Sequence, residues 1–284
     1  MFFKISALYR FWFVLIMMCG ICRMTVAGSD TATLEDKLFD AIGQHDMAAV
    51  QTLVNQGANV NAVEHRVVEK GMTPLMEAAY SGQADLAQIF IDRGAKTNVQ
   101  SKAKYSIGMT PLMWASMGSA LDNKGAVIAL LLHHGANPEA REEHGRSALM
   151  FAGAEGTSNN INALVRGGAN VNGADAAGES ALLYTAYNGR FDNFAALIHC
   201  GANVNAKDND GRTPLMVAIL APYVAHTGKD FTTQQAEAVK LLLRSGANVR
   251  ARDDRHMTTI DYALQVKSQS VLTVLQAAVG QKLL

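Results

Sequence analysis

Apolar residues recur every three or four positions in short stretches of the chain, and polar residues and glycine separate these stretches. Such spacing places the apolar side chains on one face of a helix, so each stretch predicts a short amphipathic helix. Clear examples are Leu86, Ile89 and Phe90; Phe191, Phe194, Leu197 and Ile198; and Val239, Leu242 and Leu243. Each helix is expected to end at a glycine, because glycine readily takes the left-handed conformation that closes a helix.

Two short strings alternate along the chain in a fixed order, which indicates one structural unit repeated several times. The string G-x-[TS]-[PA]-L begins at Gly71, Gly108, Gly145, Gly178 and Gly211, in steps of 37, 37, 33 and 33 residues. The string G-A-[NK] begins at Gly57, Gly94, Gly135, Gly168, Gly201 and Gly246, and it is completed three times as GANVN. The first string is expected to begin one helix, and the second to end the next helix.

The start of each unit carries helix-capping chemistry. Thr73, Thr110 and Thr213 stand at the expected N-cap position, and a proline follows each of them at the first helical position, where its missing N–H costs nothing. Each unit is therefore a helix, a turn, a second helix and an extended segment. No single unit can bury both of its helices, so neighbouring units must stack.

On these two strings the chain resembles the ankyrin-repeat family, over about residues 33–280. The resemblance implies an all-α solenoid of about seven units: a cap over 33–62, repeats starting near 71, 108, 145, 178 and 211, and a C-terminal cap over 256–284. The family usually has a histidine after T-P-L. This chain has apolar residues there, which we expect to be core: Met76, Met113, Met150, Leu183 and Met216.

Extra residues interrupt the regular period at four places: near 63–69, 101–105, 119–124 and 222–233. The last insertion is the largest, with twelve residues between the two helices of its unit. Insertions in a solenoid are expected in loops, often on a binding face.

Residues 1–27 form a separate segment that is typical of a signal peptide. The segment contains three basic residues and no acid, and an apolar run of 12 residues at 11–22 is shorter than the roughly 20 that a spanning helix needs. Thr25 and Ala27 form a small-residue cleavage site before Gly28. A basic residue such as Arg23 is unusual directly after the apolar run of a signal peptide. This leaves an uncleaved membrane anchor as the alternative. After cleavage Cys200 is the one remaining thiol.

Composition and motifs limit the functions that the chain can have. It is 49% hydrophobic and 18% charged, which excludes wholesale disorder, and its 25 basic and 25 acidic residues disfavour nucleic-acid binding. No P-loop, nucleophile-elbow or zinc-protease motif is present, so we expect no catalytic, metal or cofactor site and no enzyme. An enzyme would need a pocket near the 222–233 insertion that holds Tyr223, His226 and Asp230.

In the ankyrin-like arrangement, the first helices and the hairpin tips line a concave face where partners usually dock. Residues of two columns along the first helices are expected to form an apolar and aromatic strip there, with arginines at its rim. The alternative is that the column with Trp114, Phe151 and Tyr184 only packs between neighbouring helices. The predicted partner-binding residues are Tyr80, Trp114, Met117, Phe151, Tyr184, Tyr187, Arg146 and Arg212.

The leader and the repeats together resemble exported, periplasmic ankyrin-repeat proteins of Gram-negative bacteria. This resemblance implies a periplasmic or secreted adaptor that binds a partner protein, as accessory, inhibitor or immunity protein of an enzyme such as a secreted phospholipase-type effector. One alternative is a scaffold anchored at the inner membrane through residues 11–22, the segment through which membrane contact is expected. Another is a periplasmic support protein for an oxidative-stress enzyme.

Overall fold

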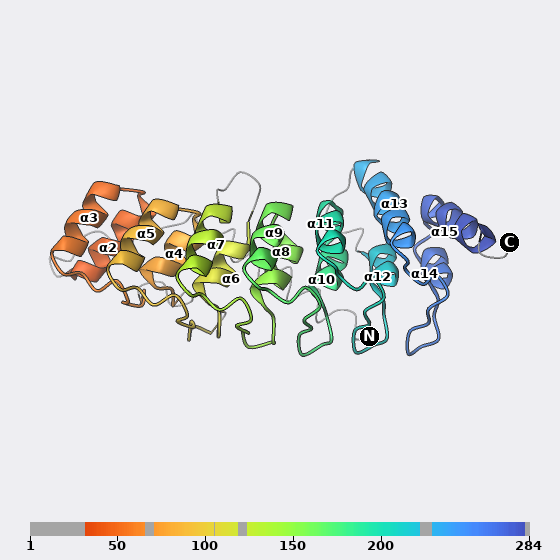
Figure 1. The fold of residues 1–284 in the computed structure, drawn as a ribbon, viewed down its shortest axis with the longest axis horizontal. Coiled ribbons are helices and arrows are strands. Elements are labelled where there is room, and N and C mark those ends of the chain that lie inside the picture. Colours follow the sequence, from red (N-terminus) through yellow and green to blue (C-terminus); the bar gives the residue numbers. More distant parts are fainter. Residues whose placement is uncertain (1–31, 66–70, 105, 119–123, 222–228, 282–284) are drawn as a thin grey trace.

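The computed structural model describes residues 32–65, 71–104, 106–118, 124–221 and 229–281. Within these ranges, fourteen α-helices form seven consecutive pairs without a β-strand, stacked in sequence order into an elongated solenoid (Figure 1). The first helices of the pairs are α2 Leu34–Gly43, α4 Pro74–Tyr80, α6 Pro111–Ser116, α8 Ala148–Glu155, α10 Ala181–Tyr187, α12 Pro214–Leu220 and α14 Thr259–Gln265. The second helices are α3 Met47–Asn55, α5 Ala84–Asp92, α7 Lys124–His133, α9 Ser158–Arg166, α11 Phe194–His199, α13 Lys229–Arg244 and α15 Gln269–Gln281.

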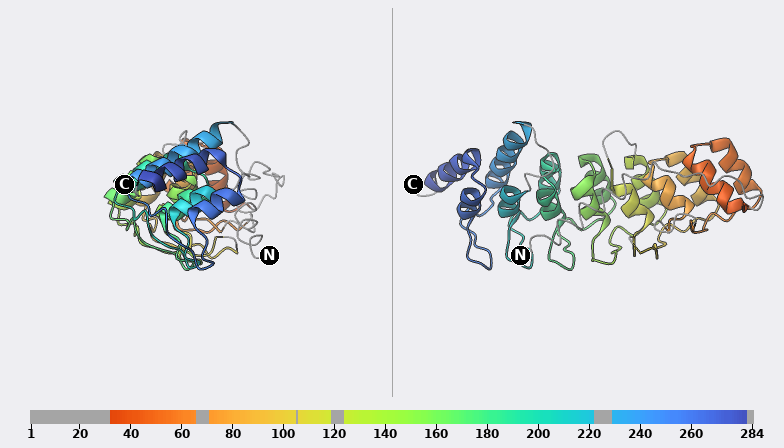
Figure 2. Two further views of the ribbon diagram at one scale, coloured as in Figure 1. Left: turned by 90° about the vertical axis from the view of Figure 1, so that its right-hand side faces the viewer. Right: turned by 180° about the vertical axis from the view of Figure 1, so that it is seen from behind.

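The helices form two rows along the solenoid. Each first helix from α4 to α12 contacts the next first helix, and each second helix from α5 to α13 contacts the next second helix. Extended hairpins connect the pairs and project from one side of the rows, as the two further views show (Figure 2). The predicted helical solenoid is therefore confirmed.

The predicted helix caps are present. The hydroxyl groups of Thr73, Thr110 and Thr213 accept hydrogen bonds from the backbone N–H three residues later, at 3.3–3.4 Å. The six glycines of the G-A string all have positive φ angles, between 79° and 95°. A side chain at these positions would strain the backbone, which is why the string begins with glycine.

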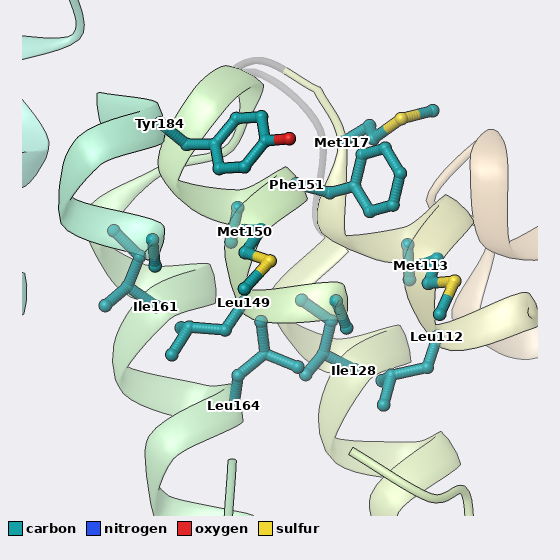
Figure 3. Packing of buried hydrophobic residues seen from close by; sticks show 14 of the residues in the cluster. Leu112, Met113, Met117, Ile128, Leu149, Met150, Phe151, Ile161, Leu164 and Tyr184 are labelled. Atoms are coloured by element: carbon teal, nitrogen blue, oxygen red, sulfur yellow. The ribbon is translucent and has the colours of Figure 1, made fainter. Parts of the chain in front are cut away.

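The core lies between the two rows of helices, and the residues after T-P form its centre. Met113 and Met150 occupy equivalent places on α6 and α8, and Ile128 and Ile161 of the second helices belong to the same packed cluster (Figure 3). All five residues of the expected Met and Leu column are at most 1% exposed. Their assignment to the core is confirmed, and soft apolar packing replaces the polar contact that the family usually has there.

The extended segments after the second helices are joined by asparagine side chains. The Asn172 amide donates to the carbonyl of Gly201 at 3.2 Å, and its oxygen accepts from the N–H of Asn203 at 2.7 Å. Asn61, Asn98 and Asn205 form the same pair of bonds to the following unit. The second asparagine of the G-A-N-x-N string thus links one unit to the next, while the first, such as Asn170, closes its own turn.

The largest insertion is partly helical, where a loop was expected. Helix α13 begins at Lys229 and has 16 residues, so the end of the 222–233 insertion lengthens the second helix of its unit. Asp230 lies in α13, whereas Tyr223 and His226 lie outside the described residues, as do 119–123 and the predicted leader. Among the residues that are described, no helix has the length and apolar character needed to cross a membrane.

Replacing Asn172 by alanine should lower the free energy of unfolding by about 1–2 kcal/mol, because two hydrogen bonds between units are lost. Urea denaturation followed by circular dichroism would measure the change. Asn159→Ala is the matched control, since Asn159 is exposed on α9 and its side chain forms no hydrogen bond within the described residues. Equal stability of the Asn172 variant and the control would contradict the linking role.

Candidate partner-binding face

A carboxylate holds each of the last four hairpins in shape. One oxygen of Asp208 accepts the backbone N–H of Asp210 at 3.0 Å and of Arg212 at 2.8 Å. Glu142, Asp175 and Asp253 do the same in their own hairpins. Each of these acids therefore caps its own turn.

The second oxygen of three of these carboxylates accepts from a tyrosine of a first helix, whereas that of Glu142 accepts from Arg146 in its own hairpin at 3.2 Å. The Tyr187 hydroxyl donates to Asp208 at 2.9 Å, so the end of α10 is tied to the hairpin of the next unit. The Tyr184 hydroxyl donates to Asp175 at 2.8 Å within its own unit, and Tyr262 donates to Asp253. The hairpins and the first helices therefore form one connected surface.

Hairpin arginines lie over aromatic rings on this surface. Arg146 lies 4.8 Å from the ring centre of Phe151, and Arg212 lies 5.5 Å from that of Tyr187. Salt bridges orient both guanidinium groups: the Arg146 Nε lies 3.0 Å from Glu142, and the Arg212 Nε lies 2.9 Å from Asp208. Arginine and aromatic ring are held together before any partner arrives.

Four of the predicted partner-binding residues are buried, so the expected exposed strip has to be corrected. Trp114, Met117, Phe151 and Tyr184 are 0%, 3%, 3% and 6% exposed. Met117, Phe151 and Tyr184 lie side by side at one end of the first helices (Figure 3). Neighbouring first helices contact one another here, and Arg146 lies over the Phe151 ring. For Trp114, Phe151 and Tyr184 the burial agrees with the alternative that their column packs between units.

The other four predicted residues remain partly accessible: Tyr80, Arg146, Tyr187 and Arg212. We call these four residues the accessible face. Tyr80 packs edge-on against Trp114, with ring centres 5.6 Å apart, and the ammonium group of Lys124 lies 5.0 Å from the Tyr80 ring centre. Lys124 is itself buried and donates to the carbonyl of Met117 at 2.6 Å.

The protonation states of the face follow from its surroundings. Burial, together with the nearby carboxylate charges, raises the pKa of Tyr184 and of Tyr187 far above the usual range, so both hydroxyls are hydrogen-bond donors at neutral pH. Burial opposes ionisation of Glu142, but its hydrogen bonds and the charge of Arg146 are stronger together and hold its pKa below the usual value.

Glu155, at the end of α8, is a residue of this region that sequence reasoning did not identify. Burial raises the pKa of its carboxyl group, although the charges of Arg146, Lys124 and Arg190 act in the opposite direction. Arg190 also donates to the carbonyls of Glu155 and Gly156 at the end of α8. No motif marks Glu155, because its surroundings combine its own hairpin with the units on either side.

The described residues contain no group of three or more histidine, cysteine or acidic side chains placed to hold a metal ion. His144 lies 3.2 Å from Glu142 and is exposed, and His65 lies 3.9 Å from Asp36. Cys200 is half-buried, with its sulfur 3.5 Å from the side-chain oxygen of Asn162. The arrangement is a surface of donors, acceptors and rings, suited to binding.

Models of ankyrin repeats match most of the sequence. The model for three ankyrin copies matches residues 38–142, 117–208 and 149–231, and the single-repeat model matches residues 210–254. This chain belongs to the ankyrin-repeat family. No curated protein sequence matches it.

Among solved structures, the chain is similar to the crystal structure of the human ASB11 ankyrin repeat domain. The two are 25% identical, with a TM-score of 0.68, and the match covers 85% of this chain and 96% of that domain. Ankyrin repeats generally mediate protein–protein interactions and typically serve as scaffolds without catalysis. The first of these properties agrees with the surface described above.

Replacing Glu155 by glutamine should raise the free energy of unfolding at pH 7. A carboxyl group whose pKa is higher in the folded than in the unfolded chain costs stability once it is ionised, and this cost disappears below the unfolded pKa, near 4.5. The two proteins should therefore have equal stability at pH 3, as measured by chemical denaturation at both pH values. Glu143→Gln, on an exposed hairpin residue, is the control; a destabilised Glu155 variant at pH 7 would contradict the prediction.

Proposed function

We propose that this ankyrin-repeat protein is an adaptor that binds one partner protein through its accessible face. The observation that carries the proposal is the ordered pair of Tyr187 and Arg212, both held by Asp208. Tyrosine and arginine are the residue types that most often dominate binding energy at interfaces. Because Asp208 already orders both side chains, binding would cost less conformational entropy than it costs with free side chains.

The finer part of the proposal concerns the setting of this binding. The signal-like residues 1–27, followed by ankyrin repeats, support an exported protein that is accessory, inhibitor or immunity protein to a partner enzyme, such as a secreted phospholipase-type effector. The mechanism would be occlusion, in which the accessible face holds the enzyme; the contribution expected from the 222–233 insertion lies mostly outside the described residues. A support protein for an oxidative-stress enzyme is the alternative with the same surface.

If residues 1–27 are not cleaved, the protein would instead be a scaffold that is anchored at the inner membrane. The two cases predict different mature N-termini. N-terminal sequencing of the protein purified from cells should find Gly28 if the leader is cleaved. An N-terminus at Met1, together with recovery in the membrane fraction, would favour the anchored scaffold.

A photo-cross-linking amino acid placed at Tyr187 should form adducts with the partner in cells. The same amino acid at Ala195, exposed on the second helix α11, is the matched control and should form none. Adducts are identified by mass spectrometry. Identical adducts at both positions, or adducts at Ala195 alone, would contradict binding through the accessible face.

A second measurement determines whether the ordered pair supplies the binding energy. Arg212→Ala should weaken binding of the cross-linked partner by at least about 2 kcal/mol, which is the size typical of a residue that dominates an interface. Isothermal titration calorimetry would measure the loss. Lys207→Ala, in the same hairpin but outside the accessible face, should leave the affinity unchanged.

A further inference from the structure

A row of cations runs along the edge of the solenoid where the second helices end. The row lies in five segments: 93–100, 133–141, 166–173, 199–207 and 244–252. Within these segments Glu139 is the one acidic residue. Asp92 lies directly before the first segment, and Glu142, Asp208 and Asp253 directly follow the second, fourth and fifth segments. The lysines and arginines of the segments, which we call the basic edge, are Arg93, Lys96, Arg141, Arg166, Lys207, Arg244, Arg250 and Arg252.

The asparagine bonds show that these segments lie next to one another in space. Asn61 binds Gly94 and Lys96, Asn98 binds Gly135, and Asn172 binds Gly201. Glu139 accepts the N–H of Asn170, which joins the third unit to the fourth. Since the second helices also follow one another along the solenoid (Figure 1), the cations form one continuous edge.

Helix capping explains only part of this edge. Cations are favoured in the last turn of a helix by its dipole, which accounts for Arg93, Arg166 and Arg244. The remaining five cations lie in the extended segments beyond the helices, where this stabilisation has faded. The whole chain has equal numbers of basic and acidic residues, so the excess on one edge is a property of the fold.

Several cations of the edge have no direct hydrogen-bond or ion-pair partner among the residues that the structure describes. Within the described part of the chain, Lys96, Arg166, Arg244 and Arg250 are exposed, and their side chains form no hydrogen bond or ion pair. Arg141 is different, because its guanidinium binds the carbonyls of Gly145 and Ala174. The free cations come from three different units, spread over most of the length of the solenoid.

We infer that the basic edge binds the anionic lipid headgroups of a membrane surface. The cations do not occupy the same position in each repeating unit. Some lie at the end of the second helix, and others lie at different places in the extended segment that follows it. A ligand with fixed spacing would need a regular row, whereas mobile lipid headgroups adapt to any arrangement. The five segments contain no Phe, Tyr or Trp, so they lack the stacking platform on which single-stranded nucleic acid is bound.

The binding is electrostatic and needs no insertion into the lipid. None of the exposed large hydrophobic residues, which include Val63, Ile107 and Leu264, belongs to the five segments. The proposal goes beyond the protein-binding function and does not depend on it. It also adds a membrane contact to the one expected from residues 11–22, because it places the repeats themselves on the surface.

Co-sedimentation of the full chain with lipid vesicles tests the proposal. Vesicles of phosphatidylcholine with about one third phosphatidylglycerol are compared with vesicles of phosphatidylcholine alone, at about 50 mM and about 500 mM salt. The test variant carries Lys96→Gln, Arg166→Gln, Arg244→Gln and Arg250→Gln. The control variant carries Lys37→Gln, Lys102→Gln, Lys104→Gln and Lys267→Gln, all exposed residues, which removes the same charge away from the edge.

Each cation near an anionic surface strengthens binding roughly fivefold. The test variant should therefore bind anionic vesicles at low salt about 600-fold more weakly than the native chain. The control variant should bind like the native chain, and neutral vesicles or high salt should remove the difference between all three. Since residues 1–27 are the same in every protein, they do not contribute to the comparison.

Equal binding of the test and control variants would overturn the proposal, and so would binding that depends on the edge for single-stranded DNA but not for vesicles. Circular dichroism melting of each variant shows whether it is folded. If the quadruple variant is unfolded, the pair Arg166→Gln and Arg250→Gln replaces it, and the expected loss is then roughly 25-fold.

Discussion

Each helix pair of this protein depends on its neighbours for the burial of its apolar residues. The first and second helices of one unit cover only part of each other, and residues such as Leu149 and Met150 become buried when the units on both sides are in place. Stacking therefore determines the position of every other feature. The methionines that follow T-P-L suit this role, because a flexible thioether fills an irregular gap where a histidine would need a partner.

The hairpin carboxylates connect the stack to the binding surface. Asp208 closes its own turn with one oxygen and orders Tyr187 and Arg212 with the other. Loss of this carboxylate would therefore disturb both the hairpin and the accessible face. A surface that is ordered in this way is preorganised for binding, because its side chains have already lost most of their conformational entropy in the free protein.

The accessible face and the basic edge are separate features of the solenoid. The first is built by hairpins and first helices, and the second by the ends of the second helices and the segments after them. In our proposals the first binds a protein and the second a lipid surface. Because no residue belongs to both, the two contacts can form at the same time, and a partner could be held close to a membrane.

The sequence by itself determined the period, the caps and the core column, because these depend on local chemistry. A threonine before a proline begins a helix, and a glycine before A-N ends one, whatever surrounds them. Tertiary structure alone decided that Phe151 and Tyr184 are buried while Tyr187 is accessible, since a neighbouring unit and a hairpin arginine cover the first two. It also decided the linking role of Asn172, whose partners are at least 29 residues away along the chain, and the basic edge, whose segments belong to different units.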